Sequence, residues 1–153
     1  MHIALVKPEI PQNTGSIART CAATDTPLHL IGQLGFELSE KRVRRAGLDY
    51  WPWVELHQHQ DWQSFSDAIS PTRFWYISKF GTRSLYEPAF EENDTFVFGS
   101  ETKGLGEDFL SSKDPDSILR IPMLNTHVRS LNLSNAVSIV LYEGLRQKLM
   151  TTR

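Results

Sequence analysis

Short apolar runs that recur along the chain limit its possible folds more than any other feature. Six such runs occur, at residues 2–6, 28–31, 54–57, 73–78, 95–99 and 117–122. Each is followed by turn residues and then by a helix-like period, an alternation typical of a mainly parallel sheet covered by helices. We therefore expect an α/β fold, with a mainly parallel sheet flanked by helices.

Length and composition predict one globular domain. The chain has 153 residues without an internal repeat or a linker-like segment, so we expect a single domain over residues 1–153. The hydrophobic content of 40% and the charged content of 22% are ordinary for such a domain. A formal charge of -2 excludes nucleic-acid binding by bulk positive charge alone, so any such surface must be local.

Cysteine usage and hydropathy predict a cytoplasmic protein with no membrane contact. Cys21 is the one cysteine of the sequence, which excludes an intrachain disulfide and favours a reducing compartment. No apolar run approaches the roughly 20 residues of a membrane span. The N-terminal residues lack the basic start and the long apolar stretch of a signal peptide.

Three segments have helical periodicity. The first is expected to begin after Asn13 or Thr14, the second covers residues 61–69, and the third begins near Ser134, a good N-cap type. The inner face of the first helix carries Ile17, Ala18, Cys21 and Ala22. The apolar stripe predicted as core on the last helix is Val137, Val140, Leu141, Leu145 and Leu149. Because Cys21 is on an inner face, we expect it to pack inertly rather than act as a nucleophile.

The loops after the apolar runs at 95–99 and 117–122 are the first places to expect a ligand, because open α/β sheets bind ligands beyond the carboxyl ends of their strands. The first loop contains Gly99, Gly104 and Gly106, which permit close backbone approach or positive φ, and Glu101 adds one charge. It matches neither the P-loop nor the dinucleotide fingerprint. A glycine-rich turn that caps a helix remains the alternative.

The second loop is unusually polar. Eight hydrogen-bonding side chains lie between Met123 and Ala136, more than helix capping requires. If the segment is buried, each of these groups needs a partner, which favours contacts with other loops and with a polar ligand such as a nucleoside. A solvated loop with one helix cap is the alternative.

Two further segments could hold anions. Arg19 lies within two turns of Asn13, and an arginine beside a helix N-terminus suits a backbone phosphate; alternatively, Asn13 is an N-cap and Arg19 a surface residue. The basic run at 41–45 is followed by three aromatic residues at 50–53, which is typical of an RNA surface. A solvated helix face followed by core aromatics is the other interpretation.

Metal binding is the weaker interpretation of the remaining polar cluster. His57, His59 and Asp61 could line one face of a strand as ligands, but no further ligand cluster supports them. Asp61 is better placed to cap the helix that begins there. We therefore expect no metal.

Four motifs occur in the order found in one family. They are PEIPQNTGSIARTC, KRVRRAGLDY, FVFGSETKGLG and RIPMLNTHVRSLNLSNAVSIVLYE, and together they span nearly the whole chain. The chain resembles the SPOUT methyltransferases of the TrmH-like group, most closely its small members that act on the wobble nucleotide of tRNA. The resemblance implies a C-terminal trefoil knot, a homodimer, no accessory RNA-binding domain and S-adenosylmethionine as methyl donor, with S-adenosylhomocysteine as product. Pattern reasoning alone does not predict a knot.

The resemblance also implies a role for individual residues. Those matching cofactor-binding positions are Ile77, Gly99, Glu101, Gly104, Ile121, Ser130, Leu131 and Asn132. The catalytic set is Arg19, Asn13, Ser134 and Asn135, and the RNA-binding set is Lys41, Arg42, Arg44, Arg45 and Arg129. Because a guanidinium stays charged, we expect Arg19 to position a phosphate and stabilise the developing alkoxide rather than act as a base.

The implied reaction is methylation of the ribose 2′-hydroxyl of C34 or a modified U34 in leucine-type tRNAs, through contacts with the anticodon stem-loop. Two alternatives remain. The same chemistry could act on another tRNA position or on ribosomal RNA, because the motifs specify the cofactor better than the RNA. The chain could also be a non-catalytic, knotted RNA-binding dimer.

Overall fold

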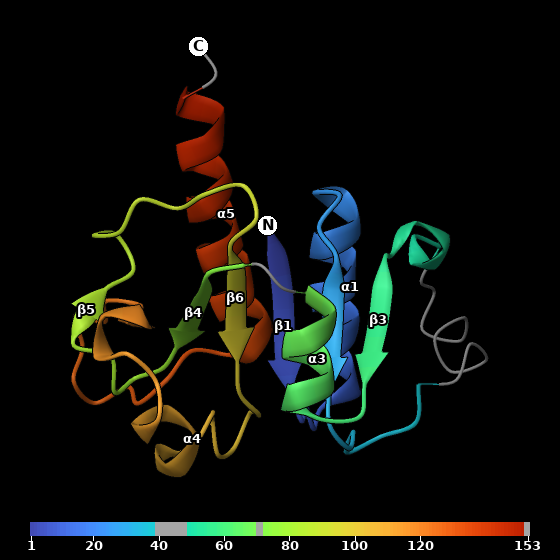
Figure 1. Ribbon diagram of the computed structural model, residues 1–153, viewed down its shortest axis with the longest axis horizontal. Coiled ribbons are helices and arrows are strands. Elements are labelled where there is room, and N and C mark those ends of the chain that lie inside the picture. Colours follow the sequence, from blue (N-terminus) through green and yellow to red (C-terminus); the bar gives the residue numbers. More distant parts are fainter. Residues whose placement is uncertain (39–48, 70–71, 152–153) are drawn as a thin grey trace.

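The computed structural model describes residues 1–38, 49–69 and 72–151, and these form the predicted α/β fold (Figure 1). The strands are β1 (His2–Val6), β2 (Leu28–Ile31), β3 (Leu56–His59), β4 (Phe74–Ile77), β5 (Arg83–Ser84), β6 (Thr95–Phe98) and β7 (Ile118–Arg120). The helices are α1 (Pro11–Ala23), α3 (Trp62–Ile69), α4 (Glu107–Ser111) and α5 (Leu133–Thr151), with 3-10 helices η1 (Trp51–Trp53) and η2 (Pro115–Ser117).

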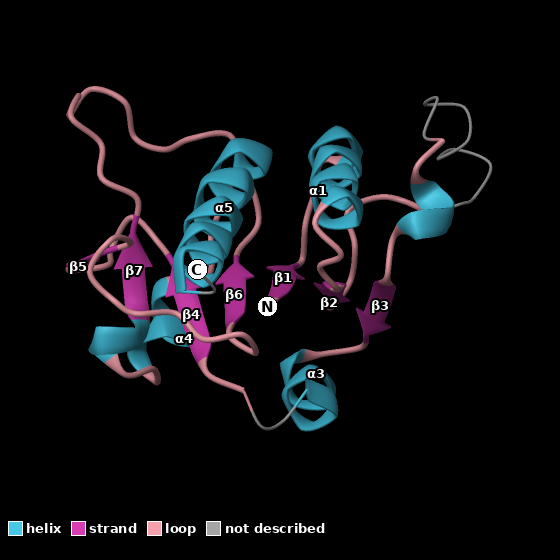
Figure 2. Ribbon diagram, turned by 90° about the horizontal axis from the view of Figure 1, so that it is seen from above, coloured by secondary structure: helices cyan, strands magenta, loops and turns pink. Residues whose placement is uncertain are grey.

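The strands form one sheet in the order β3-β2-β1-β6-β4-β7-β5, and each neighbouring pair is parallel. Helices α1 and α5 cover one face, and α3 and α4 lie on the other (Figure 2). Every residue of β2 and β6 is buried, as expected of strands covered on both faces. Two apolar cores result, one around Ile17 and Leu141 beneath α1 and α5, the other around Phe65 beneath α3.

Both long helices differ from prediction at one end. Helix α1 begins at Pro11, whose fixed φ suits the first helical position, so Asn13 lies inside the first turn and is not the N-cap. The stripe of α5 is core at Val137 and its neighbours, but Leu149 is 70% exposed, so its assignment to the core was wrong. The reason is length, because α5 extends beyond the edge of the sheet (Figure 1).

Two short elements and one strand differ from prediction. The strand expected at 54–57 lies two residues later, and β5 and α4 were not predicted as elements.

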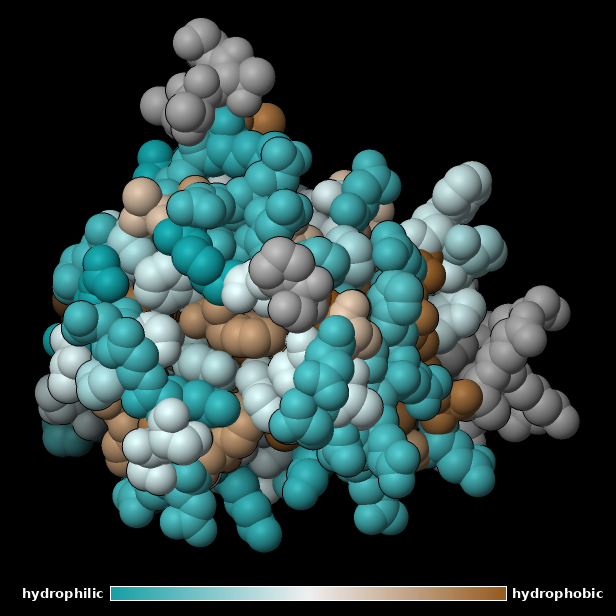
Figure 3. Space-filling view, viewed as in Figure 1, coloured by the Kyte–Doolittle hydropathy of each residue, from teal (hydrophilic) through white to brown (hydrophobic). Residues whose placement is uncertain are grey.

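Cys21 is fully buried, and burial raises its pKa to about 12, which agrees with inert packing. In the described part of the chain, no helix is both long and apolar enough to cross a bilayer. On the face seen in Figure 3, hydrophobic surface is limited to small areas among hydrophilic side chains.

Candidate functional site

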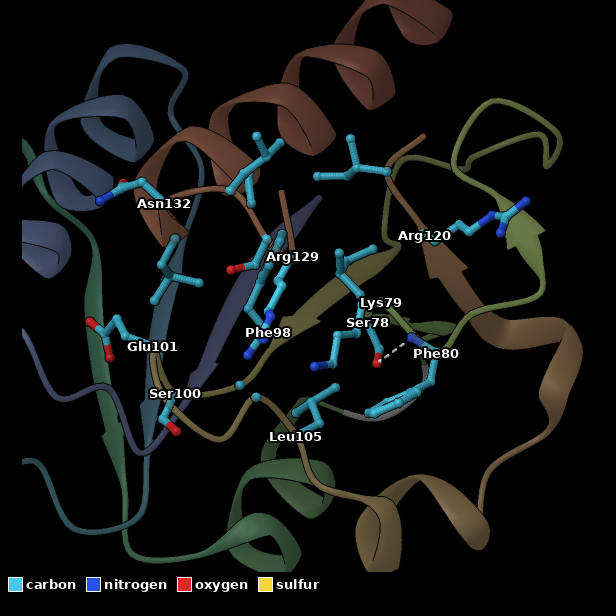
Figure 4. Close-up of a pocket in the computed structure, with 18 of the residues that line it drawn as sticks. Ser78, Lys79, Phe80, Phe98, Ser100, Glu101, Leu105, Arg120, Arg129 and Asn132 are labelled. Carbon is cyan, nitrogen blue, oxygen red and sulfur yellow. Dashed lines mark hydrogen bonds between the residues drawn. The ribbon is translucent and has the colours of Figure 1, made fainter. Parts of the chain in front are cut away.

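A cavity of about 680 Å³ lies at the carboxyl edge of the sheet, within the size range of small-molecule sites. The loops that follow β4, β6 and β7 enclose it, and the last of these loops is residues 121–132 (Figure 4). Its apolar walls include Ile77, Phe98, Leu105, Ile121 and Leu131. Both of the loops that the sequence singled out line this cavity, and ligand binding there stays a prediction.

The glycine-rich loop after β6 is shaped by close backbone approach. A Cβ added to Gly99 would lie 1.9 Å from the carbonyl carbon of Gly104, so no larger residue fits there. The amide of Gly104 donates to the carbonyl of Ser100 over 2.9 Å, and Gly104 itself has a φ of 61°. Gly106, with a φ of 84°, occupies the N-cap position of α4. The expected positive φ and the start of a helix are both confirmed, and the same loop lines the cavity, where ligand binding stays a prediction.

Glu101 joins this loop to the amino end of α1. Its carboxylate accepts hydrogen bonds from the backbone amides of Glu9 over 2.7 Å and Ile10 over 3.0 Å, and from Asn13 Nδ2 over 3.3 Å. The anion at this helix end is therefore a side chain of the same chain, where the sequence suggested a phosphate. Glu101 lines the cavity, as its predicted cofactor role requires, but its oxygens face α1.

Asn132 connects the polar segment to the same helix. Its Nδ2 donates to Asn13 Oδ1 over 3.0 Å, while its Oδ1 accepts from the backbone amides of Ser134 over 2.9 Å and Asn135 over 3.4 Å. Asn132 thus caps α5, and the prediction of Ser134 as the N-cap was wrong, because the side chain two residues earlier already bonds these amides. Glu101, Asn13 and Asn132 are thus linked by hydrogen bonds that join two loops to the first turn of α1.

Capping explains only part of the polar segment. Asn125 Oδ1 accepts from the amide of His127 over 2.9 Å, which stabilises the turn locally. Among the described residues, the side chains of Arg129 and Ser130 have no hydrogen-bond partner, and both line the cavity. Residues 124–132 are all exposed, as the solvated-loop alternative expects, and the polar residues among them that line the cavity are Asn125, Thr126, Arg129, Ser130 and Asn132.

The predicted catalytic residues do not all meet within this chain. Asn13 lines the cavity, whereas Arg19, Ser134 and Asn135 lie outside its lining. Arg19 is exposed on α1, with its guanidinium carbon 5.6 Å from the centre of the Tyr50 ring.

Tyr50 contacts Arg19, and the sequence did not predict this contact. Its hydroxyl donates to the carbonyl of Gly15 over 2.8 Å, which fixes the ring against α1. Burial raises the pKa of Tyr50, and the charge of Arg19 opposes this shift. The phenol therefore stays neutral and offers its ring face to the guanidinium.

The predicted RNA surface is described only at its margin. Lys41, Arg42, Arg44 and Arg45 lie outside the described residues. Of the aromatic residues that follow them, Trp51 packs partly against the core, but Trp53 is 77% exposed. The core-aromatics alternative is thus right for Trp51 and wrong for Trp53.

Histidines form an unexpected cluster beneath α3. Because parallel neighbours are in register, His29 on β2 lies beside His57 on β3, with ring centres 4.9 Å apart. His29 Nε2 is 3.0 Å from His2 Nδ1, and His29 Nδ1 is 3.0 Å from His59 Nε2. Burial, then the neighbouring histidines, lowers the pKa of His29 to about 3.

The metal interpretation of this region gains no support. Asp61 accepts from the backbone amide of Ser64 over 2.8 Å and so caps α3, as predicted. Among the described residues, no group of three or more His, Cys, Asp or Glu side chains, the histidine cluster included, is arranged so that it could hold a metal ion. The alternation of His57 and His59 on one strand signalled a common face, but only the pairing of strands reveals their partners.

Comparisons with known proteins agree with this architecture. The SpoU rRNA Methylase family model matches residues 1–142. The tRNA (cytidine(34)-2'-O)-methyltransferase of Saccharophagus degradans is 49% identical over 146 residues, covering 95% of this chain and 94% of its own. A solved structure that concerns the 2-OH methylation of C/U34 on tRNA is 47% identical, with a TM-score of 0.89 and coverage of 99% and 97%.

A more distant structure shares the fold. The SpoU methyltransferase AviRb from Streptomyces viridochromogenes, in complex with the cofactor AdoMet, has a TM-score of 0.83 and 23% identity. This chain aligns over 98% of its length with 61% of AviRb.

Proposed function

Because this chain belongs to the SpoU rRNA Methylase family, we propose that it is a tRNA 2′-O-methyltransferase that acts on the wobble nucleotide, C34 or a modified U34. The reaction transfers the methyl group of S-adenosylmethionine to the ribose 2′-hydroxyl and releases S-adenosylhomocysteine. The observation that carries this conclusion is near full-length similarity, at 49% identity, to a relative named for the same reaction at position 34. We propose leucine-type tRNAs as the substrates.

The cavity has the features that the methyl donor requires. Its walls are apolar where an adenine would pack, and Gly99 and Gly104 are also part of its lining. Residues proposed to hold the donor are Ile77, Gly99, Gly104, Ile121, Ser130 and Leu131, all of which line the cavity. When bound, the donor supplies a methyl group on a positively charged sulfur.

The side chains of this chain would provide orientation and charge stabilisation rather than a strong base. Because a guanidinium group is positively charged, the role of Arg19 is to hold a phosphate near the target ribose and to stabilise negative charge on the 2′-oxygen. Asn13 is held on both sides, by Glu101 and by Asn132, and presents a fixed amide at the cavity. Such fixed groups lower the barrier mainly through proximity and orientation.

A homodimer is part of the proposal. Arg19 lies on the exposed face of α1, outside the cavity of its own chain, so in this proposal a second copy brings its Arg19 to the cavity. Ser134 and Asn135, at the start of α5, would contribute to the same interface.

The tRNA anticodon stem-loop would contact the basic run at 41–45 and Arg129. We also propose that residues 1–153 form one SPOUT domain with a trefoil knot, and that the protein acts in the cytoplasm, where its tRNA substrate is found. The knot and the location stay predictions.

Transfer of labelled methyl from S-adenosylmethionine to tRNA without ribose methylation, followed by nucleoside mapping, tests this function. We expect one 2′-O-methyl group at position 34. Arg19→Ala should reduce transfer at least about 100-fold while S-adenosylhomocysteine binds as before. Unchanged transfer would remove Arg19 from its role, and a methyl group only on ribosomal RNA would refute the tRNA assignment.

A further inference from the structure

The cavity carries an excess of positive charge. Its described lining includes Lys79, Lys103, Arg120 and Arg129, whereas Glu101 is the one acidic residue. The carboxylate of Glu101 is already bonded to two backbone amides and an asparagine at the start of α1. Within the described lining, no other carboxylate is therefore present to balance the positive charges.

Lys79 is held in place by a tight turn. The amide of Ser78 donates to the carbonyl of Leu119 on β7 over 2.9 Å, and the amide of Gly81 donates to the carbonyl of Ser78 over 3.1 Å. A Cβ on Gly81 would lie 2.7 Å from the carbonyl carbon of Leu119, so the turn is pressed against β7. Figure 4 shows the Lys79 side chain directed into the cavity, and its Nζ is 5.1 Å from the centre of the Phe80 ring.

Arg129 approaches from the opposite wall. It belongs to the polar segment before α5, and Figure 4 shows its side chain directed into the cavity and toward Lys79. Arg120, by contrast, points away from the cavity in the same view. Two cations on separate loops thus converge at one place.

Neither cation has an acidic partner within the described part of the chain. Some basic side chains elsewhere do have acidic partners, as Arg73 has Asp94 and Arg146 has Glu143. Like charges that converge without a counter-charge repel each other, so this arrangement favours binding of an anion. A guanidinium fork and an ammonium group suit an oxyanion with two or more oxygen atoms.

We propose that Lys79 and Arg129 together bind an oxyanion inside the cavity. This inference rests on the proposed function, which supplies two sources of such a group: the α-carboxylate of the methyl donor and a backbone phosphate of the tRNA. The resemblance assigns Arg129 to RNA and gives Lys79 no role, so the pairing of the two is new.

Binding measurements on Lys79→Met, Arg129→Met and the double variant test the site. The ligands are S-adenosylhomocysteine, 5′-methylthioadenosine, which lacks the amino-acid part, and unmethylated tRNA at several salt concentrations. Lys7→Met is the matched control, because Lys7 is an exposed lysine at the end of β1 that does not line the cavity.

If the oxyanion is the donor carboxylate, S-adenosylhomocysteine should bind at least about tenfold more weakly to each variant, while the binding of methylthioadenosine should not change. If the oxyanion is a tRNA phosphate, the binding of both nucleosides should not change and tRNA should bind more weakly. The salt dependence of tRNA binding should then fall by a slope of about one for each cation removed. If all three ligands bind every variant as they bind the control, the oxyanion site is refuted. If the unsubstituted protein binds neither S-adenosylhomocysteine nor tRNA, the proposed function fails and the site loses its ligands with it.

Discussion

The histidine cluster should make the protein less stable in mild acid. His29 is 6% exposed, and its pKa is lowered to about 3 from an ordinary 6.5, mainly by burial. As the pH falls, His29 therefore binds a proton near pH 6.5 in the unfolded chain but only near pH 3 in the folded chain. Stability is complete above pH 6.5 and falls as the pH decreases through this window.

The size of the effect follows from the shift. Each pH unit below 6.5 lowers the free energy of unfolding by about 1.4 kcal/mol for this one group, which gives about 2 kcal/mol between pH 7.5 and pH 5. The pKa values of His2 and His59 are also lowered, mainly by burial, so their contributions have the same sign.

Urea unfolding at pH 7.5 and pH 5 measures this loss. In His29→Gln, the amide can still donate and accept hydrogen bonds but does not titrate, so we expect the loss between the two pH values to shrink by about 2 kcal/mol. His127→Gln, at an exposed position, is the control and should behave like the unsubstituted protein. An equal loss in His29→Gln and in the unsubstituted protein would refute the reasoning.

Three further predictions concern other parts of the structure. Gly99→Ala places a methyl group on the Gly104 backbone and should abolish S-adenosylhomocysteine binding, measured by calorimetry; binding as tight as that of the unsubstituted protein would contradict this. Tyr50→Leu removes the ring beside Arg19 and should slow methyl transfer by up to roughly fivefold without weakening donor binding; an equal slowing in the Arg19→Ala background would show that the ring acts elsewhere. Asp94 is 1% exposed and accepts from an arginine, a tryptophan and a backbone amide, so Asp94→Ala should lower the free energy of unfolding by about 3 kcal/mol, and a loss below about 1 kcal/mol in urea would contradict this.

The sequence predicted most of the sheet because buried parallel strands are continuous apolar runs. Residues 28–31 and 95–98 are fully buried, as their composition indicates. Helix ends were less certain, because Asn132 and Ser134 are both good cap residues and only the fold shows which side chain reaches the amides. A two-residue strand such as β5 has too little periodicity to be recognised.

Contacts between distant segments could not be predicted from local pattern. Glu101 and Asn13 are 88 positions apart, and their hydrogen bond exists because β1 and β6 are neighbours in the sheet. The histidine cluster likewise depends on the pairing of β2 with β3. Lys79 follows a predicted strand, a position typical of ligand residues, but only the cavity shows its convergence with Arg129.

The measurement that tests the central claim most directly is methyl transfer to two synthetic tRNAs that differ only at the sugar of nucleotide 34. One carries ribose there and the other carries 2′-deoxyribose, so the second lacks the proposed acceptor oxygen. We expect labelled methyl to enter the ribose form and none to enter the deoxyribose form. Equal transfer to both would contradict the assignment of the 2′-hydroxyl of nucleotide 34 as the acceptor.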